Sequence, residues 1–353
     1  MRKFAKYILL FINAIAIGGL IVSYVSLYFP PDKGWLISLA GMAYPWILLG
    51  NILLMMFWLF TKPKFILLSL LTILLGFNVA SRYFQLSGRT TEDEGIKVVS
   101  YNVKHFTGTG RNPSKDLADL IKGFLKETEP DIICLQEVKL RSNHIFNLQA
   151  AKSEFPSIRH YQYARASGTG GSVTLTRFPI VKMQEIRFEN SGNIAICTDV
   201  VANNDTIRIF NIHLQSYRID PDKYRIIGRQ RITDEKDLEE VKELGMKYRD
   251  AVKMRAKQAR VIHEKISSSP YPVIVCGDFN DPPSSYSYQK VRGDLVDSFV
   301  DSGRGIGRTY IGKLPSFRID YILHSDTFDS YNFKVYDVPY SDHLPVACEL
   351  IRN

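Results

Sequence analysis

The chain has 353 residues, enough for one large domain and a further segment, and a formal net charge of +9. Residues 1–88 hold seven Lys or Arg and one Asp, so residues 89–353 carry 38 basic against 35 acidic side chains, or only +3. So small an excess excludes charge as an argument for nucleic-acid binding. The basic residues at the N-terminus are explained by membrane topology instead.

The four cysteines lie in apolar, strand-like runs: Cys134, Cys197, Cys276 and Cys348. They show no Cys-x-x-Cys spacing and no Cys–His cluster, which argues against a zinc site. We therefore expect buried free thiols, with a disulfide as the open alternative for an exported domain.

Three apolar runs open the chain. Residues 7–29 and 35–60 carry no charge, and both exceed the roughly 20 residues that cross a bilayer core. The third run, residues 65–80, is shorter, but Lys64 and Arg82 can extend it by snorkelling. We predict transmembrane helices at 7–29, 35–60 and 65–82 within a membrane region of residues 1–86. Two spans plus an interfacial segment is the alternative, and a cleaved signal peptide is disfavoured by the apolar runs that follow.

The loops predict an orientation. Basic residues precede the first run and occupy the second loop: Arg2, Lys3, Lys6, Lys62 and Lys64. Positive residues favour the cytoplasmic side, so we place the N-terminus there and the domain after the third run outside. Arg82 and Arg89 count against this, because they put positive charge on the outer side. The expected location is an inner or plasma membrane, with the protein held by its N-terminal helices.

A polar linker at residues 87–95 leads into a domain at residues 96–353. Apolar or alternating runs predict strands at 96–103, 131–136, 172–176, 195–201, 206–212, 272–276, 319–323 and 346–351. Helical spacing marks residues 116–128, where an apolar stripe precedes Pro130, and residues from about 236 to 266. Short strands mixed with few helices indicate an α/β sandwich of two packed sheets with helices outside.

Residues 217–269 are rich in alternating charge. A basic cluster of Arg225, Arg229 and Arg231 precedes the helical part. The stretch fits a solvated loop with a surface helix. The alternative is a loop beside an active-site rim that touches anionic substrate or lipid head groups.

Polar side chains stand at the ends of the predicted strands. They are Asn102, Glu137, His213, Asp278, Asn280, Asp320, Asp342 and His343. This placement predicts that the strands deliver them to one rim, where a divalent metal and a phosphate can be held. Hydrolysis of a phosphodiester needs a hard cation, an activated water and a stabilised leaving group. Mg²⁺ prefers oxygen ligands, which the Glu137 carboxylate and the Asn102 amide offer.

The remaining motif residues suggest proton chemistry. Asp278 and Asn280, two apart on an extended segment, face the same side, so Asp278 can hold or activate a water. His343 is a candidate general base, or a cation that steadies the transition state, with Asp320 as its orienting partner. Asp320 alternatively pairs with Arg318. Asp342 is a second metal-side carboxylate or an orienting group.

The histidines differ in the support that their context gives. His213 taken alone fits a buried core histidine. Five others have no second motif nearby and are interpreted as structural or surface groups: His105, His144, His160, His263 and His324. His105 is the least settled, because it follows Asn102 by three residues.

These motifs, in this order, resemble the endonuclease/exonuclease/phosphatase superfamily, which includes pancreatic-type deoxyribonucleases, abasic-site endonucleases, neutral sphingomyelinases and inositol-polyphosphate 5-phosphatases. The resemblance covers about residues 96–352 and implies a four-layer α/β sandwich, two mixed sheets flanked by helices. It implies metal roles for Asn102 and Glu137, and a phosphate contact for His213. Asp278 and Asn280 would align and activate the nucleophile, and Asp320 would pair with His343.

Subfamily signals are weaker. Cys276 precedes Gly277, and the segment that ends at Asp320 reads Ser-Phe-Arg-Ile-Asp, so the motifs of the 5-phosphatases are not matched. His213 looks more like the deoxyribonucleases and sphingomyelinases, which both tolerate the Arg-Ile-Asp-Tyr motif.

We therefore predict a membrane-anchored phosphodiester hydrolase that depends on Mg²⁺ or Mn²⁺. Its substrate is a nucleic acid, slightly favoured on family breadth, or a phospholipid head group. The alternative from another class is a non-catalytic membrane protein that binds phosphorylated ligands. The sequence indicates no protein partner.

Overall fold

Two six-stranded sheets form the body of the structure. The computed structural model describes residues 3–108, 110, 114–139, 148, 155, 157–166, 170–218, 235–312 and 317–353. The first sheet has the order β11-β12-β1-β2-β4-β3 and comprises β1 (Ile96–Asn102), β2 (Ile132–Val138), β3 (His160–Arg165), β4 (Gly171–Thr176), β11 (Phe328–Val335) and β12 (Val346–Arg352). The second has the order β5-β6-β7-β8-β10-β9 and comprises β5 (Ile180–Arg187), β6 (Ile194–Ala202), β7 (Asp205–His213), β8 (Val273–Asp278), β9 (Val296–Asp297) and β10 (Asp320–His324).

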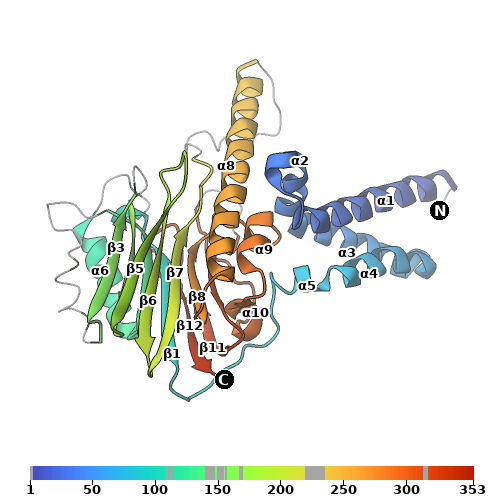
Figure 1. Cartoon of the computed structure of the whole chain (residues 1–353). Coiled ribbons are helices and arrows are strands. Elements are labelled where there is room, and N and C mark those ends of the chain that lie inside the picture. Colours follow the sequence, from blue (N-terminus) through green and yellow to red (C-terminus); the bar gives the residue numbers. More distant parts are fainter. Residues whose placement is uncertain are drawn as a thin grey trace.

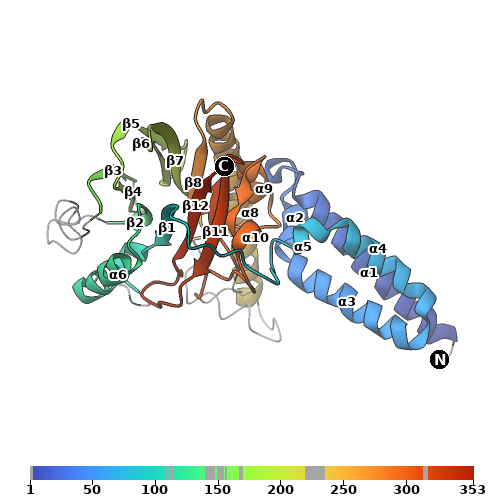
Figure 2. The ribbon, with the colours of Figure 1, turned by 90° about the horizontal axis from the view of Figure 1, so that it is seen from below.

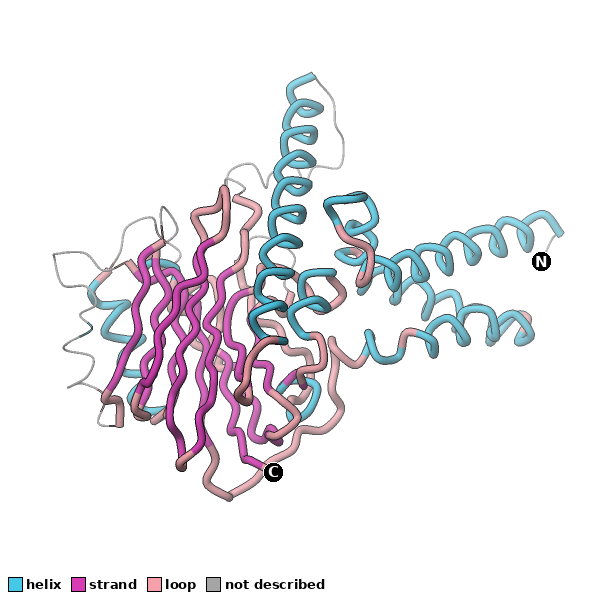
Figure 3. The backbone as a smooth tube through the Cα atoms, in the orientation of Figure 1, coloured by secondary structure: helices cyan, strands magenta, loops and turns pink. Residues whose placement is uncertain are grey.

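Both sheets are mixed, because each contains one parallel pair among antiparallel ones, β1 with β2 and β7 with β8. Figure 3 shows the strands gathered between helices. The inner faces pack on each other through side chains such as Val98, Ile209 and Ile274, none of which is exposed. The four cysteines are free and buried, as expected, and three of them lie in this inner core.

Helices cover the two outer faces (Figure 1). They are α6 (Lys115–Thr128) on the first sheet, and α8 (Glu235–Ser267) with α9 (Tyr286–Arg292) on the second, while the short α10 (Ser298–Ser302) lies beside β10 and β11. In α6 the Ser114 hydroxyl caps the N-terminus by accepting from the Leu117 N–H (3.4 Å), and Ile121 and Leu125 face the sheet. The predicted four-layer α/β sandwich is confirmed.

A bundle of N-terminal helices projects from the sandwich (Figure 2). It contains α1 (Lys3–Ser26), α2 (Pro31–Met42), α3 (Tyr44–Thr61), a 3₁₀ turn at Pro63–Phe65, α4 (Ile66–Leu75) and α5 (Phe77–Ala80). Two helices, Phe4–Ser26 and Tyr44–Thr61, are long and apolar enough to cross a membrane. Length and composition alone are weak evidence for crossing.

The predicted single helix at 35–60 is divided at Ala43 into α2 and α3. Pro45 lacks an N–H for the carbonyl of Gly41, which instead accepts from the Ser284 hydroxyl (2.7 Å). The third predicted span is also shorter, since α4 has ten residues and stops at Gly76. Arg82 does not extend it toward a head group. The side chain is buried and donates to the Pro283 carbonyl (3.1 Å) of the sandwich.

The bundle has polar as well as apolar side chains in its interior, and many large apolar side chains on its outside. Between α1, α3 and α4, Asn13 donates to Ser69 (3.1 Å) and accepts from the Trp58 indole (3.1 Å), and all three residues are buried. Large apolar residues such as Phe11 and Leu71 are largely exposed instead. A water-soluble bundle would instead keep such large apolar side chains on its inward face.

Candidate active site

Adjacent strands of the second sheet bring three titratable side chains together. In the register, His213 at the end of β7 lies opposite Asp278 at the end of β8, and Asp278 lies opposite Asp320 at the start of β10. Gly277 permits this close approach: its φ is +145°, and a Cβ there would overlap the Ile212 carbonyl of β7. An L-residue at 277 would push β8 away from β7 and separate His213 from Asp278.

The first sheet supplies the opposite side of the site. Asn102 ends β1, and Glu137 lies near the end of the neighbouring β2, at a register shift where its own φ is +56°. His343 lies in the segment just before β12, which pairs with β1, and the Ser341 hydroxyl fixes this segment by donating to the Asn102 carbonyl (2.8 Å). The rim predicted from the sequence therefore forms where the two sheets meet.

Asp278 is the centre of the hydrogen-bond network. Its Oδ2 accepts from the side-chain amides of Asn102 (2.9 Å) and Asn280 (3.1 Å), and its Oδ1 accepts from the Asn280 N–H (2.8 Å). The residue is 1% exposed, and burial raises the pKa of its carboxyl group, although the charges of His343 and His213 act in the opposite direction. A carboxylate with a raised pKa that is also held in place is a better proton acceptor for a water molecule.

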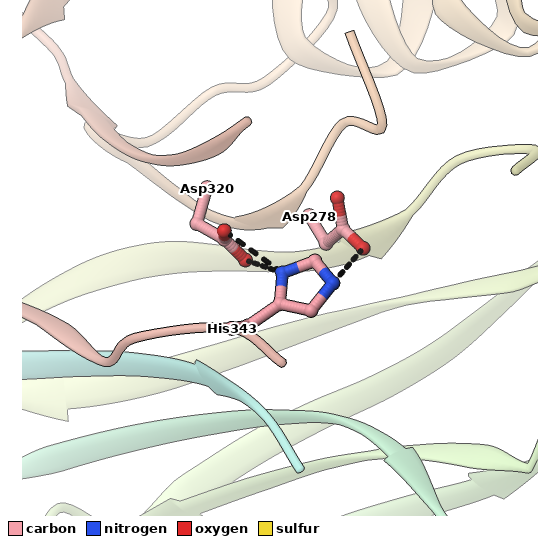
Figure 4. Close-up of side chains that lie close together, drawn as sticks. All are labelled: Asp278, Asp320 and His343. Atoms are coloured by element: carbon pink, nitrogen blue, oxygen red, sulfur yellow. Dashed lines mark hydrogen bonds and ion pairs between the residues drawn. The ribbon is translucent and has the colours of Figure 1, made fainter. Parts of the chain in front are cut away.

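His343 lies between two carboxylates (Figure 4). Its Nδ1 is 3.0 Å from Asp320 Oδ2, and its Nε2 is 3.7 Å from Asp278 Oδ2. Burial disfavours the charged ring, but Asp320 and Asp278 outweigh it and raise the pKa of His343 to about 10. The ring is therefore an imidazolium at neutral pH. Of the two roles left open for His343, the geometry favours the cation over the general base.

Replacing Asp320 by Asn tests this ion pair. A raised pKa means that the pair stabilises the fold fully below the ordinary histidine pKa, near 6.5, and loses this effect as the pH rises through about 10. In buffer with EDTA we expect Asp320→Asn to lower Tm by about 5 °C or more at pH 6, and much less near pH 10. The control is Asp326→Asn, at an exposed loop position. A Tm difference that does not change with pH would contradict the pairing.

Glu137 faces two imidazoles. Its Oε2 is 3.3 Å from His105 Nε2, and its Oε1 is 3.4 Å from His213 Nε2. Burial lowers the pKa of both histidines and raises the pKa of Glu137. The carboxylate is thus flanked by neutral rings. Within the described part of the chain, His213 Nε2 is buried without a hydrogen-bond partner of good geometry.

These residues fit a divalent cation. A carboxylate that burial disfavours, with neutral rings beside it, would be relieved by a positive charge. The Glu137 side chain is 21% exposed, so the group is not sealed off. The Asn102 amide oxygen accepts from the Lys104 N–H (3.0 Å), which leaves it one further lone pair. Oxygen donors of this kind suit Mg²⁺ or Mn²⁺ better than zinc.

Asp342 forms an ion pair with Lys104, Nζ to Oδ2 at 2.8 Å. Of the two roles left open for Asp342, this geometry fits the orienting group. The alternative partner considered for Asp320 was Arg318. Arg318 instead donates a hydrogen bond to Asp297 (2.8 Å). The predicted basic cluster of Arg225, Arg229 and Arg231 lies outside the described residues, as does His144.

Two site residues were missed from the sequence. Lys104 and His105 follow Asn102 in a turn where both residues have positive φ, 42° and 56°, which returns their side chains to the rim. His105, expected to be a structural or surface group, lies directly against the Glu137 carboxylate. Its spacing from Asn102 was a signal, but a strained turn cannot be inferred from residue types alone.

A cavity of about 200 Å³ opens over this network. Glu137, Asp278, Asn280 and His343 form its polar side, and Lys104, Arg218 and Asp342 also line it. The remaining lining residues are Met42, Ser216, Tyr217, Pro282, Tyr310, Phe317 and Ile319. The arrangement provides a place for a phosphoester directly beside the carboxylate and the imidazolium.

Two family profiles match parts of the chain. A family profile described as the Endonuclease/Exonuclease/phosphatase family matches residues 99–343. Another, described as a domain of unknown function (DUF8431), matches residues 6–83. Over 266 residues the chain is 26% identical to the CCR4-Not complex 3'-5'-exoribonuclease subunit Ccr4 of Aspergillus niger, covering 61% of this chain and 39% of that protein. The chain thus spans about two fifths of the length of this relative.

Solved structures show the same fold. One similar structure is an endonuclease/exonuclease/phosphatase from Beutenbergia cavernae, with a TM-score of 0.53 and 15% identity over 74% of this chain and 72% of that one. The human Nocturnin catalytic domain gives 0.51 and 18% over 74% and 94%, and truncated TDP2 of Caenorhabditis elegans gives 0.53 and 17% over 72% and 97%. Identities this low support the fold alone.

Proposed function

This chain belongs to the Endonuclease/Exonuclease/phosphatase family of hydrolases that act on phosphoester bonds, and we propose that it is a membrane-anchored phosphodiesterase dependent on Mg²⁺ or Mn²⁺. The observation that carries the proposal is the network around Asp278. One buried carboxylate is held by two amides, and the His343 imidazolium lies beside it at the floor of a cavity.

The side chains divide the work of hydrolysis between them. Asp278 orients a water molecule and takes one of its protons as the water oxygen bonds to phosphorus and the bond to the leaving oxygen breaks. The leaving oxygen takes a proton from solvent. His343, held by Asp320, stabilises the negative charge that grows on the phosphoryl oxygens. His213, whose Nε2 has no hydrogen-bond partner of good geometry, donates a hydrogen bond from this atom to a phosphate oxygen.

Glu137 and Asn102 would hold the divalent cation. When bound, the cation neutralises phosphate charge and stabilises the leaving oxygen. Asp342 keeps Lys104 directed into the cavity, where the ammonium group attracts the phosphate.

The N-terminal helices support the membrane anchor. Their outer surface is largely apolar, and buried polar side chains join the helices by hydrogen bonds, as is common between membrane helices. Lys6 lies over the Phe65 ring at 5.4 Å, so the basic N-terminus and the basic loop after α3 share the end of the bundle far from the sandwich. We propose that this end is cytoplasmic and that the catalytic domain lies outside. On the proposed outer side, Arg82 binds the Pro283 carbonyl and Arg89 binds Asp301.

RNA is one candidate for the phosphodiester substrate. It is favoured by the similarity to the Aspergillus Ccr4 subunit, whose name specifies a 3'-5'-exoribonuclease. The nearly neutral domain gives this candidate no electrostatic support.

Metal removal tests the proposal. For the full-length protein in detergent we expect EDTA to abolish release of p-nitrophenol from bis(p-nitrophenyl) phosphate, and added Mn²⁺ or Mg²⁺ to restore it. Glu137→Gln should raise the Mn²⁺ concentration for half-maximal activity at least tenfold, because the carboxylate charge is lost. Glu94→Gln, at an exposed linker position, is the matched control. Activity that is unaffected by EDTA would contradict the proposal.

A further inference from the structure

The N-terminal helices contribute a residue to the lining of the catalytic cavity. Met42, at the end of α2, lines the cavity directly. Four residues later, in α3, the Trp46 ring meets the Phe317 ring edge-on with centroids 5.4 Å apart, and Phe317 also lines the cavity. The region outside the catalytic sandwich is thus part of the site.

This region is attached to the segments that carry the catalytic residues. Arg82 donates to the Pro283 carbonyl (3.1 Å), three residues after Asn280, and its own carbonyl accepts from Arg318 (2.9 Å), two residues before Asp320. The Ser284 hydroxyl donates to the Gly41 carbonyl beside Met42 (2.7 Å). The helices therefore hold a fixed position at the site rather than only tethering the domain.

The α8 helix lies beside α2 and contacts it through side chains (Figure 1). Arg260 forms two hydrogen bonds to the Asp32 carboxylate, both 3.0 Å. Farther along α2, Ser38 shares a hydrogen bond with the Tyr248 hydroxyl (3.0 Å). These contacts fix α2 beside the sandwich independently of the loops at the active site.

The lining of the cavity is chemically mixed. Besides the carboxylates and His343 it includes four apolar residues, Met42, Pro282, Phe317 and Ile319, which we call the apolar wall. A phosphate bound at the polar side would place one of its ester substituents against this apolar wall. Apolar surface is buried favourably by an alkyl or acyl group, whereas a ribose and its next charged phosphate would gain little there.

The aromatic rings near the cavity do not favour stacked bases. The Tyr217 ring is already engaged by the Tyr248 ring, stacked at 5.5 Å, and by the Arg255 guanidinium at 4.4 Å. Tyr310 packs edge-on to His343 at 5.3 Å. Single-stranded nucleic acid needs aromatic platforms and a row of cations. Among the described residues two such cations, Lys104 and Arg218, line this cavity, and Asp342 already pairs with Lys104, so they do not form a row.

The apolar wall lies at the level where the proposed membrane surface meets the sandwich. Trp46 is in the first turn of α3, which runs away from the sandwich, and its side chain is 52% exposed (Figure 2). Tryptophan is enriched at membrane–water interfaces. A substrate chain that leaves the cavity past Phe317 and Trp46 would enter the outer layer of the bilayer.

We propose that the substrate is an amphipathic phosphodiester, a lipid phosphoester taken from the adjacent membrane leaflet. Its apolar chain would lie against Met42 and Phe317 of the apolar wall and against the neighbouring Trp46. This inference rests on the proposed hydrolytic function and names the substrate class of the same site. Met42 and Phe317 act as specificity-determining residues.

The test compares two substrates with the same leaving group. Full-length protein in phosphatidylcholine vesicles with Mn²⁺ is given methyl p-nitrophenyl phosphate or hexadecyl p-nitrophenyl phosphate. We expect kcat/KM for the hexadecyl ester to exceed that for the methyl ester at least about tenfold, the gain from burying two methylene groups. In Met42→Ser and Phe317→Ser this ratio should fall at least threefold, and in Met42→Leu it should be kept. Met183→Ser, at an exposed position of β5, is the matched control.

The outcomes separate this inference from the proposed function. No metal-dependent turnover of either ester, by protein that melts cooperatively, would overturn the hydrolytic function. Equal turnover of both esters, with the ratio unchanged in the variants, would overturn the lipid inference alone. A single-stranded RNA cleaved with a higher kcat/KM than the hexadecyl ester would overturn it too. The ratio of kcat/KM for the two esters is measured first on the wild-type protein. The test therefore remains decisive even if a variant fails to fold.

Discussion

Asp278→Asn is expected to lower kcat about 10³- to 10⁴-fold on any phosphodiester that the protein cleaves. The asparagine keeps the size of the side chain but cannot accept the proton of the attacking water, and removing a positioned general base costs a factor of this order. In the wild type, the carboxylate oxygen of Asp278 accepts hydrogen bonds from the side-chain amides of Asn102 and Asn280. The asparagine can place its own amide donor at this position. Steady-state release of p-nitrophenol from the full-length protein measures the effect.

The matched control is Asp294→Asn, at an exposed position after α9, which should retain the wild-type kcat. Thermal melting of both variants separates a chemical effect from unfolding. A kcat within threefold of wild type in folded Asp278→Asn would contradict the role assigned to Asp278.

His343→Gln is expected to lower kcat about 10²- to 10³-fold with a change in KM of less than about threefold. Glutamine can still donate a hydrogen bond but carries no charge, so the loss falls on the transition state, where charge develops on the phosphoryl oxygens. The control is His263→Gln, on α8, because His263 does not line the cavity. It should leave kcat unchanged.

The pH profile decides between the two roles of His343. A pKa of about 10 keeps the ring charged, so activity that needs the imidazolium should persist from pH 7 to 9 and fall as the pH rises through about 10. A general base would instead gain activity as it loses its proton. A rise in kcat that follows deprotonation of His343, absent in His343→Gln, would contradict the cation role.

The sequence was sufficient for the central strands and not for the edges. All eight predicted strands lie inside the two sheets, where both faces are covered and the residues form continuous apolar runs. The four strands without a prediction, β3, β5, β9 and β11, are the four edges of the sheets. In β5, Lys182 and Glu185 are exposed and only Ile186 is buried, and β11 contains a register shift. Edge strands carry such polar residues and irregularities, which hide the strand pattern.

For the site, the sequence predicted most of the residues that meet and the pairing of Asp320 with His343, but not the other pairings. Strand ends after apolar runs marked Asp278, Asp320 and His343, which the structure brings together. The partner of Arg318 could not be predicted, because Asp297 is 21 residues away in sequence and meets it only through the fold. The orienting pair of Lys104 and Asp342 depends in the same way on tertiary contacts.

The N-terminal helices show a similar limit. Hydropathy identified the apolar runs, but it treats every apolar residue as facing lipid. The structure uses Gly41 and Met42 to meet the catalytic loops instead, and this requires the break in the helix before Pro45. A window average cannot separate a residue that faces lipid from one that faces another domain.

The most direct test of catalysis measures binding and turnover in the same sample. Full-length protein in vesicles, with Mn²⁺, is mixed with hexadecyl p-nitrophenyl phosphate, and bound ester and released p-nitrophenol are quantified for wild type and Asp278→Asn. Our account predicts multiple turnovers by the wild type, and retained binding with turnover reduced about 10³-fold or more in the variant. Stoichiometric binding without turnover by the wild type would contradict it and identify the protein as a receptor for phosphorylated ligands.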